Sequence, residues 1–489
     1  MSLRLLAKDT AIYGLSSIVG RFLNWLLVPL YTYTLTNAAE YGIVTNLYSW
    51  LALLMVLLTY GMETTFFRYA NKDGANPQTV FSTAFLSIAG STLIFCAGAL
   101  FFLRPIGEAL QYNGHSELIV LIMVILALDL LMAIPFCYLR FLSRPIRFAS
   151  LKLLFIAINI GLNLFFLLVM PRIVEGTQWE ERLLQPGWEI KSIIVSNLVG
   201  NVVLFLALLP TILSVSLRFD LTLWKQMIRY TYPLLILGLA GMLNQTADKI
   251  LLPLLVENKQ EALSMLGIYG ANFKIAVVMV MFAQAFRFAY EPYFFAQGKQ
   301  KGEDNRIMLA NAMKYFIIFA LFIYLGVMGY LDILKYFIGP SYYEGLKIVP
   351  VVMITELLFG IFFNLSVWYK LTDKTQWGAY FSIAGAIITV GLNILFIPQY
   401  GYWACAWVGL ISYLVMTIAS YITGKKYYPI PYRFKKTIGA YLLFTAIASI
   451  VLIGSSSLPS WVRIVEGTLF LVVYLLMVYR KEWKHLKSR

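Results

Sequence analysis

The sequence predicts an all-α protein that crosses a membrane about fourteen times. Three observations support this fold class. First, 60% of the 489 residues are hydrophobic and only 13% are charged, whereas soluble domains are about half apolar and a quarter charged. Second, the mean hydropathy is +0.75. Third, most of the chain consists of apolar stretches of roughly 20 to 27 residues, and each can span a hydrocarbon core as a helix.

These stretches define the expected spans and their orientation. The spans are 10–36, 41–67, 79–103, 117–139, 148–170, 191–215, 230–256, 263–295, 307–333, 344–369, 376–398, 402–424, 437–454 and 459–479. About 26 Lys and Arg residues lie in loops on the side of the N-terminus, against about 8 on the other side. Because cytoplasmic loops are enriched in Lys and Arg, we expect both termini in the cytoplasm. We also expect the first span to be retained, since no small-residue cleavage site follows it.

Several classes of protein lack the residues that they need. The three cysteines lie inside spans and only two histidines occur, so neither a disulfide framework nor a metal or cofactor site is expected. No G-x-x-x-x-G-K-[ST] string occurs, which excludes ATP hydrolysis by this chain. The net charge of +15 follows from topology and requires no nucleic acid. The longest outward loop, 171–190, is small for a membrane glycan polymerase or ligase, so a carrier is favoured over an enzyme.

A weak internal repeat relates the first and seventh spans. Pro29 is followed by a short polar loop and Gly42, and Pro253 is followed by a similar loop and Gly267. This similarity favours a six-helix unit that is used twice, as in many transporters. We therefore expect an N-terminal lobe at 1–218, a C-terminal lobe at 219–430 and an additional helix pair with a basic tail at 431–489.

Polar residues inside the spans are the best functional candidates, because an ionised group in a bilayer must face protein or water. The first span carries a polar stripe with helical spacing that comprises Thr10, Gly14, Ser17, Arg21 and Asn24. The seventh and eighth spans carry two more, Gly238, Gly241, Gln245 and Asp248 in one and Gln284, Arg287 and Glu291 in the other. The three stripes could line one cavity between the lobes.

Other interpretations of the basic residues stay open. Arg287 and Glu291 have the i, i+4 spacing of a pair that neutralises itself. Lys274 precedes Arg287 by thirteen residues, so the two need not share a helix face. Lys249 follows Asp248 directly, and we expect these two side chains to point to different faces.

Two further features concern charge near the membrane. Lys314 lies near the inner end of its span and is expected to extend to the surface. Among acids, Asp129 and Glu356 lie at the centres of the fourth and tenth spans. Each acid could couple transport to an ion or serve as a fixed counter-ion to a basic residue. The same two alternatives apply to Asp248 and Glu291.

At the level of whole segments the sequence resembles a known family of carriers. The resemblance rests on LAKDTAIYGLSSIVGRFLNWLLVPLY at the start, YGMETTFFRYANKD at the end of the second span and YGANFKIAVVMVMFAQAFRFAYEPYFF in the eighth. These segments are similar to Wzx-type flippases of the polysaccharide branch of the multidrug/oligosaccharidyl-lipid/polysaccharide flippase superfamily. The resemblance implies two six-helix lobes around a central cavity, plus a final helix pair, in the bacterial inner membrane.

The resemblance also implies a substrate and a mechanism. Similar proteins move an undecaprenyl-pyrophosphate-linked oligosaccharide, an O-antigen or capsule unit, to the outer leaflet by alternating access. Substrate-binding residues would then be Arg21, Asn24, Lys274 and Arg287. Expected partners are the lipid-linked glycan, membrane lipids and other polysaccharide-assembly proteins. Two alternatives of the same superfamily are a multidrug exporter and a peptidoglycan-precursor (lipid II) flippase.

Overall fold

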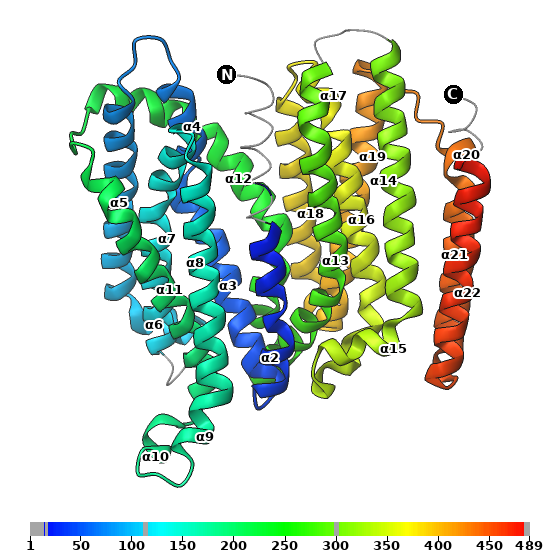
Figure 1. The fold of residues 1–489 in the computed structure, drawn as a ribbon, viewed down its shortest axis with the longest axis horizontal. Coiled ribbons are helices and arrows are strands. Elements are labelled where there is room, and N and C mark those ends of the chain that lie inside the picture. The colour runs from blue at the N-terminus through cyan, green and yellow to red at the C-terminus, as the bar shows by residue number, and fades with distance from the viewer. Residues whose placement is uncertain (1–13, 15–17, 111–115, 298–302, 484–489) are drawn as a thin grey trace. The chain divides into compact units, whose positions relative to one another are not determined.

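The computed structural model describes residues 14, 18–110, 116–297 and 303–483. Within these ranges every regular element is a helix, which confirms the all-α fold (Figure 1). Twelve of the described helices are long and apolar enough to cross a membrane. The other two expected spans are the first, described only in part, and α12 (Leu221–Leu255), which is long enough but more polar. The expectation of about fourteen spans therefore holds.

The helix boundaries follow the expected spans closely. The first span contains helical residues 18–25. The helices before α12 are α2 (Leu27–Thr34), α3 (Ala38–Thr59), α4 (Met62–Ala70), α5 (Pro77–Phe101), α6 (Leu103–Leu110), α7 (Ser116–Phe141), α8 (Pro145–Leu164), α9 (Met170–Val174), α10 (Glu180–Leu183) and α11 (Trp188–Leu213). Those after it are α13 (Lys259–Gln297), α14 (Glu303–Gly329), α15 (Leu331–Leu334), α16 (Val349–Leu365), α17 (Val367–Leu371), α18 (Gln376–Tyr400), α19 (Tyr402–Tyr427), α20 (Phe434–Thr437), α21 (Gly439–Gly454) and α22 (Ser460–Val478). Short π and 3₁₀ segments are η1 (Phe165–Val169), η2 (Lys335–Phe337), η3 (Pro340–Ile348), η4 (Ser455–Ser457) and η5 (Tyr479–Trp483).

Local signals explain where several helices start and stop. Asn37 caps α3 by accepting a hydrogen bond from the backbone N–H of Glu40 at 3.1 Å. Asp220 caps α12 by accepting from the N–H groups of two residues in its first turn. The second expected span is divided into α3 and α4 because Tyr60 and Gly61 adopt left-handed backbone angles.

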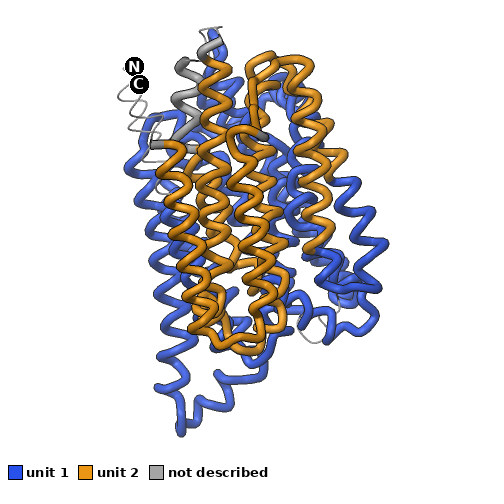
Figure 2. Tube along the Cα trace, turned by 90° about the vertical axis from the view of Figure 1, so that its right-hand side faces the viewer, with its two compact units in different colours: residues 1–270, 386–405 blue, residues 271–385, 406–489 orange. Residues whose placement is uncertain are grey.

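The chain divides into two compact units, shown in Figure 2. Unit 1 comprises residues 1–270 and 386–405, and unit 2 comprises residues 271–385 and 406–489. In unit 1, α11 packs along α7 and α8, and α12 packs along α3. In unit 2, α14 packs against α16, α21 and α22. These units are defined by contacts between residues, whereas the expected lobes 1–218 and 219–430 were defined by a sequence repeat. The lobe boundaries therefore stay a prediction.

The two glycines of the proposed repeat meet inside unit 1. A Cβ atom on Gly42 would lie 1.9 Å from the carbonyl oxygen of Leu263, and one on Gly267 would lie 1.8 Å from that of Ala38. Each contacted residue precedes the partner glycine by four positions, so the contact between α3 and α13 is symmetric. Only glycine permits backbones to approach this closely. The structure therefore brings the equivalent positions of the repeat into direct contact.

In unit 2 the last helix, α22, is attached to α14 along its length. Gly329 and Gly467 let the two backbones touch, since a Cβ on Gly467 would lie 2.5 Å from the Cα of Gly329. At one end of this contact Arg463 forms an ion pair with Asp332, with an N–O distance of 2.8 Å. Further along, the Tyr474 hydroxyl donates a hydrogen bond to the carbonyl oxygen of Ile318 at 2.8 Å. The final helix pair is therefore a packed part of unit 2.

The expectation that Lys314 extends to the surface is wrong. Its Nζ lies 2.5 Å from a carboxylate oxygen of Glu482, and both side chains are largely buried. The other oxygen of that carboxylate accepts a hydrogen bond from the Tyr441 hydroxyl at 3.2 Å. The cause lies in the tertiary structure. Because α22 packs on α14, Glu482 of the following segment η5 lies beside Lys314 of α14.

Candidate functional site

Arg21 and Asn24 lie on the exposed face of the first helix of unit 1. Gly20, one turn before Asn24, faces α8, where a Cβ on Gly20 would come within 2.7 Å of Ile156. The Asn159 amide of α8 approaches the Asn24 side-chain oxygen at 3.5 Å, at the outer limit of a hydrogen bond. The helix thus contacts α8 through Gly20 and Asn24, and Arg21 is an exposed residue. Thr10 and Ser17, from the same stripe, lie outside the described residues.

Two cations of unit 2 lie on one aromatic ring. The Arg287 guanidinium carbon is 4.1 Å from the ring centroid of Phe363, and the Lys370 Nζ is 4.8 Å from the same centroid. Each cation interacts favourably with the face of the ring, but two like charges held this close repel each other. An anion with several oxygens could bind both cations and remove that repulsion. We refer to Arg287, Lys370 and Phe363 as the cation pair site.

Sequence reasoning missed Lys370 because it was counted among loop cations. Phe363 and Lys370 are seven residues apart, a spacing that keeps two residues on one helix face. That spacing was a usable signal. Lys274 does not join the cation pair site, because thirteen residues of α13 separate it from Arg287, or roughly 20 Å of helix axis. Lys274 is half-buried.

Asp248 is held by several donors within unit 1. The Lys249 Nζ lies 3.1 Å from its carboxylate, and the Tyr269 hydroxyl donates a hydrogen bond to it at 2.6 Å. The expectation that Asp248 and Lys249 point to different faces is therefore wrong. The lysine side chain is long enough to fold back along α12, where its Nζ also donates to the carbonyl oxygen of Gln245 at 3.0 Å. An ion that bound Asp248 would have to displace a fixed ammonium group.

Asp129 of α7 lies in a second charged cluster in unit 1. It interacts electrostatically with Lys152 of α8 and with the hydroxyl group of Tyr48. Lys152 was counted as a loop cation, but its Nζ lies 4.2 Å from the centroid of the Phe136 ring of α7. The packing of α8 against α7 therefore supplies a basic partner that the sequence order did not reveal. A role of Asp129 in coupling to an ion stays a prediction.

The remaining candidates are less well defined by geometry. Glu356 is a buried residue of α16. Glu291 belongs to α13, but its side chain lies outside the described part of the chain. Among the described residues, no group of three or more His, Cys, Asp or Glu side chains could hold a metal ion. Cys96, Cys137 and Cys405 are free thiols.

The described helices are those of a polytopic membrane protein. Three solved structures have a similar fold. The lipid II flippase MurJ in an inward closed conformation matches with a TM-score of 0.73 and 14% identity, over 96% of this chain and 98% of that one. An inward-facing multidrug resistance MATE transporter of the MOP superfamily matches with a TM-score of 0.58 and 13% identity, over 87% and 94%. The Vibrio cholerae MATE transporter VcmN matches with a TM-score of 0.58 and 12% identity, over 86% and 94%.

Sequence comparison then defines the family. Residues 6–297 match the polysaccharide biosynthesis protein family, so the chain belongs to that family. A search of curated proteins found no match by sequence. The family and the fold together define a polytopic helical membrane protein of the polysaccharide biosynthesis family.

Proposed function

We propose that this protein is a flippase for an undecaprenyl-pyrophosphate-linked oligosaccharide, such as an O-antigen or capsule repeat unit of the Wzx type. The observation that carries the proposal is the cation pair site, because it places a guanidinium and an ammonium group on one ring, and a pyrophosphate is an anion that both groups recognise. Membership of a polysaccharide biosynthesis family supports a glycan as the cargo. The lipid II flippase activity of the relative MurJ supports a second candidate of the same chemical class.

In this proposal the protein lies in the bacterial inner membrane with both termini in the cytoplasm, as the distribution of Lys and Arg indicates. The two lobes rock about a central cavity, and Arg21 and Asn24 on one lobe and Lys274 on the other contact the head group in different states. The lipid tail stays in the bilayer. An ion gradient drives the cycle through one or more of Asp129, Asp248, Glu291 and Glu356. Other polysaccharide-assembly proteins supply and consume the glycan.

The experiment is translocation of a labelled lipid-linked glycan by the purified protein in vesicles. We expect the glycan to cross with its mass unchanged, which separates a flippase from a polymerase or ligase. Arg287→Gln and Lys370→Gln should each slow translocation by roughly 10- to 100-fold, as expected for the loss of a charged hydrogen bond to phosphate. Lys374→Gln is a matched control, because the Nζ of Lys374 instead lies 3.6 Å from the ring centroid of Tyr427.

Two outcomes would contradict the proposal. One is unchanged glycan translocation by the Arg287→Gln/Lys370→Gln double variant. The other is an Arg21→Ala variant that translocates glycan normally but no longer exports cationic dyes. That result would favour the multidrug exporter alternative.

A further inference from the structure

Unit 2 contains an apolar pocket of about 700 Å³. Its walls come from α14, α16 and α19 on one side and from α20, α21 and the residue between them on the other. All but a few of the lining side chains are aliphatic or aromatic, so water gains little from entering it. This volume is in the usual range for small-molecule sites.

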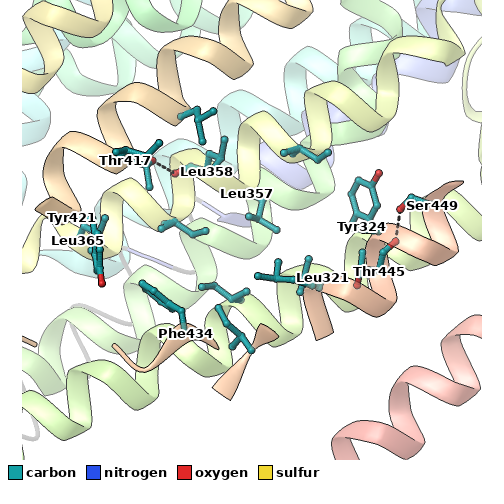
Figure 3. Close-up of a pocket in the computed structure, with 18 residues that line it drawn as sticks. Leu321, Tyr324, Leu357, Leu358, Leu365, Thr417, Tyr421, Phe434, Thr445 and Ser449 are labelled. Atoms are coloured by element: carbon teal, nitrogen blue, oxygen red, sulfur yellow. Dashed lines mark hydrogen bonds between the residues drawn. The ribbon is translucent and has the colours of Figure 1, made fainter. Parts of the chain in front are cut away.

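The pocket is elongated along the helices. Figure 3 shows Leu365, Tyr421 and Phe434 at one end and Tyr324, Thr445 and Ser449 at the other. On α14, lining residues extend from Ile317 to Tyr324. Along α20 and α21 the lining runs from Phe434 to Ser449, or roughly 20 Å of helix. Such a shape fits a single fatty acyl chain.

A second, more polar cavity of about 280 Å³ adjoins the end of the pocket at Phe434, which lines both. Basic and hydroxyl or amide side chains line this cavity, among them Lys314, Arg433, Asn311 and Thr437. The carboxylate next to it, Glu482, is already bound by Lys314 and Tyr441. Arg433 is exposed, and its guanidinium can donate hydrogen bonds to a phosphate oxygen in this cavity.

The surroundings of this cavity are also basic. Exposed cations among the described residues of unit 2 near this end include Lys425, Lys426, Lys436, Arg480 and Lys481. Arg306 lies with its guanidinium carbon 4.8 Å from the centroid of the Tyr428 ring. A cluster of Lys and Arg beside a membrane attracts anionic lipid by about 1 kcal/mol for each charge near the surface.

The helix pair beside the pocket is fixed to the rest of unit 2. The glycine contact of Gly329 with Gly467 and the hydrogen bond of Tyr474 join α22 to α14, and the ion pair of Arg463 with Asp332 joins α22 to α15. α21 packs against both α14 and α22. The pocket is thus a built feature of unit 2.

We propose that the two cavities form one site for an anionic phospholipid of the cytoplasmic leaflet. The phosphate group binds Arg433 beside the ion pair of Lys314 with Glu482, and one acyl chain fills the apolar pocket. This assignment relies on the membrane orientation of the proposed function. The bound molecule is not the transported substrate, because a cavity of about 280 Å³ accepts a phosphate and glycerol but not a pyrophosphate that carries an oligosaccharide. The lipid serves to join α20 and α21 to the bundle.

The test is lipid binding by the full-length protein, measured by native mass spectrometry in a mild detergent without glycan substrate. Phosphatidylglycerol and phosphatidylcholine with identical acyl chains are compared. We expect the anionic lipid to be retained preferentially. Arg433→Gln should weaken its binding roughly tenfold, the effect of about 1.4 kcal/mol, whereas Lys72→Gln, an exposed cation of unit 1, should leave it unchanged.

A second pair of variants tests the acyl chain. Ala446 lines the apolar pocket, whereas Ala440 lies on the same helix and lines neither cavity. Ala446→Trp should reduce lipid retention strongly, and Ala440→Trp should not. The unfolding temperature without added lipid shows whether either variant folds. Equal binding of the two phospholipids, unchanged binding by Arg433→Gln or Ala446→Trp, or a polyprenyl phosphate in place of the phospholipid would overturn the proposal. Because no transport is measured, these results are independent of the flippase assay.

Discussion

Replacing Gly267 by alanine tests the contact between the two repeats. The added Cβ would lie 1.8 Å from the carbonyl oxygen of Ala38, whereas ordinary contact begins near 3.4 Å. The two backbones would have to separate by about 1.6 Å, and no flexible side chain can relieve the overlap. Overpacking of this kind typically costs about 1–3 kcal/mol. The helix propensity of alanine returns at most about 1 kcal/mol.

The control is Gly90→Ala in α5, where no heavy atom lies within 4 Å of the added Cβ. This variant should be neutral or slightly stabilised, by up to about 1 kcal/mol. The assay is thermal and denaturant unfolding of both variants in the same detergent, combined with the vesicle translocation assay. We expect Gly267→Ala to unfold at a clearly lower temperature than Gly90→Ala.

Symmetry extends this prediction to Gly42. Gly42→Ala should be destabilised to a similar degree, because its Cβ would lie 1.9 Å from the carbonyl oxygen of Leu263. The double variant should cost much less than the sum of the two, since one separation of α3 from α13 relieves both overlaps. If Gly267→Ala were as stable and active as the control, or if the two effects were strictly additive, the contact between the repeats would not be as close as argued.

The remaining predictions concern ion pairs. Glu482→Gln leaves Lys314 with a buried, unpaired charge and should destabilise the protein by about 3–5 kcal/mol. Calorimetry should show that stability is partly recovered in a Lys314→Met/Glu482→Leu variant. If Glu482→Gln were as stable as the wild type, the ion pair would not contribute to stability. Asp129→Asn should lower stability through Lys152, and Lys152→Gln should restore it if the aspartate is only a counter-ion. If transport stays lost in that stable double variant, the coupling role gains support. Asp248→Asn should likewise destabilise unit 1, and an unfolding temperature equal to that of the wild type would show that the pair with its neighbouring lysine contributes nothing.

Within single helices, the sequence was a reliable guide. Apolar length predicted the spans, twelve of which are described helices long and apolar enough to cross a membrane. This success has a physical cause, because the rise of a helix fixes how many apolar residues are needed to cross a hydrocarbon core. The match of Gly42 with Gly267 suggested equivalent positions of a repeat, but it did not predict that the two would touch.

Contacts between helices were decided only by the tertiary structure. Lys152 interacts with Asp129 because α8 packs beside α7, and Lys314 is neutralised because α22 docks on α14. The sequence predicted that Lys314 extends to the surface, and its pattern gave no partner for Lys152. In the chain these partners are separated by one or more loops, and no local pattern records which helix a loop brings alongside. A long basic side chain can also turn toward whichever acid, ring or lipid phosphate that packing places within its reach.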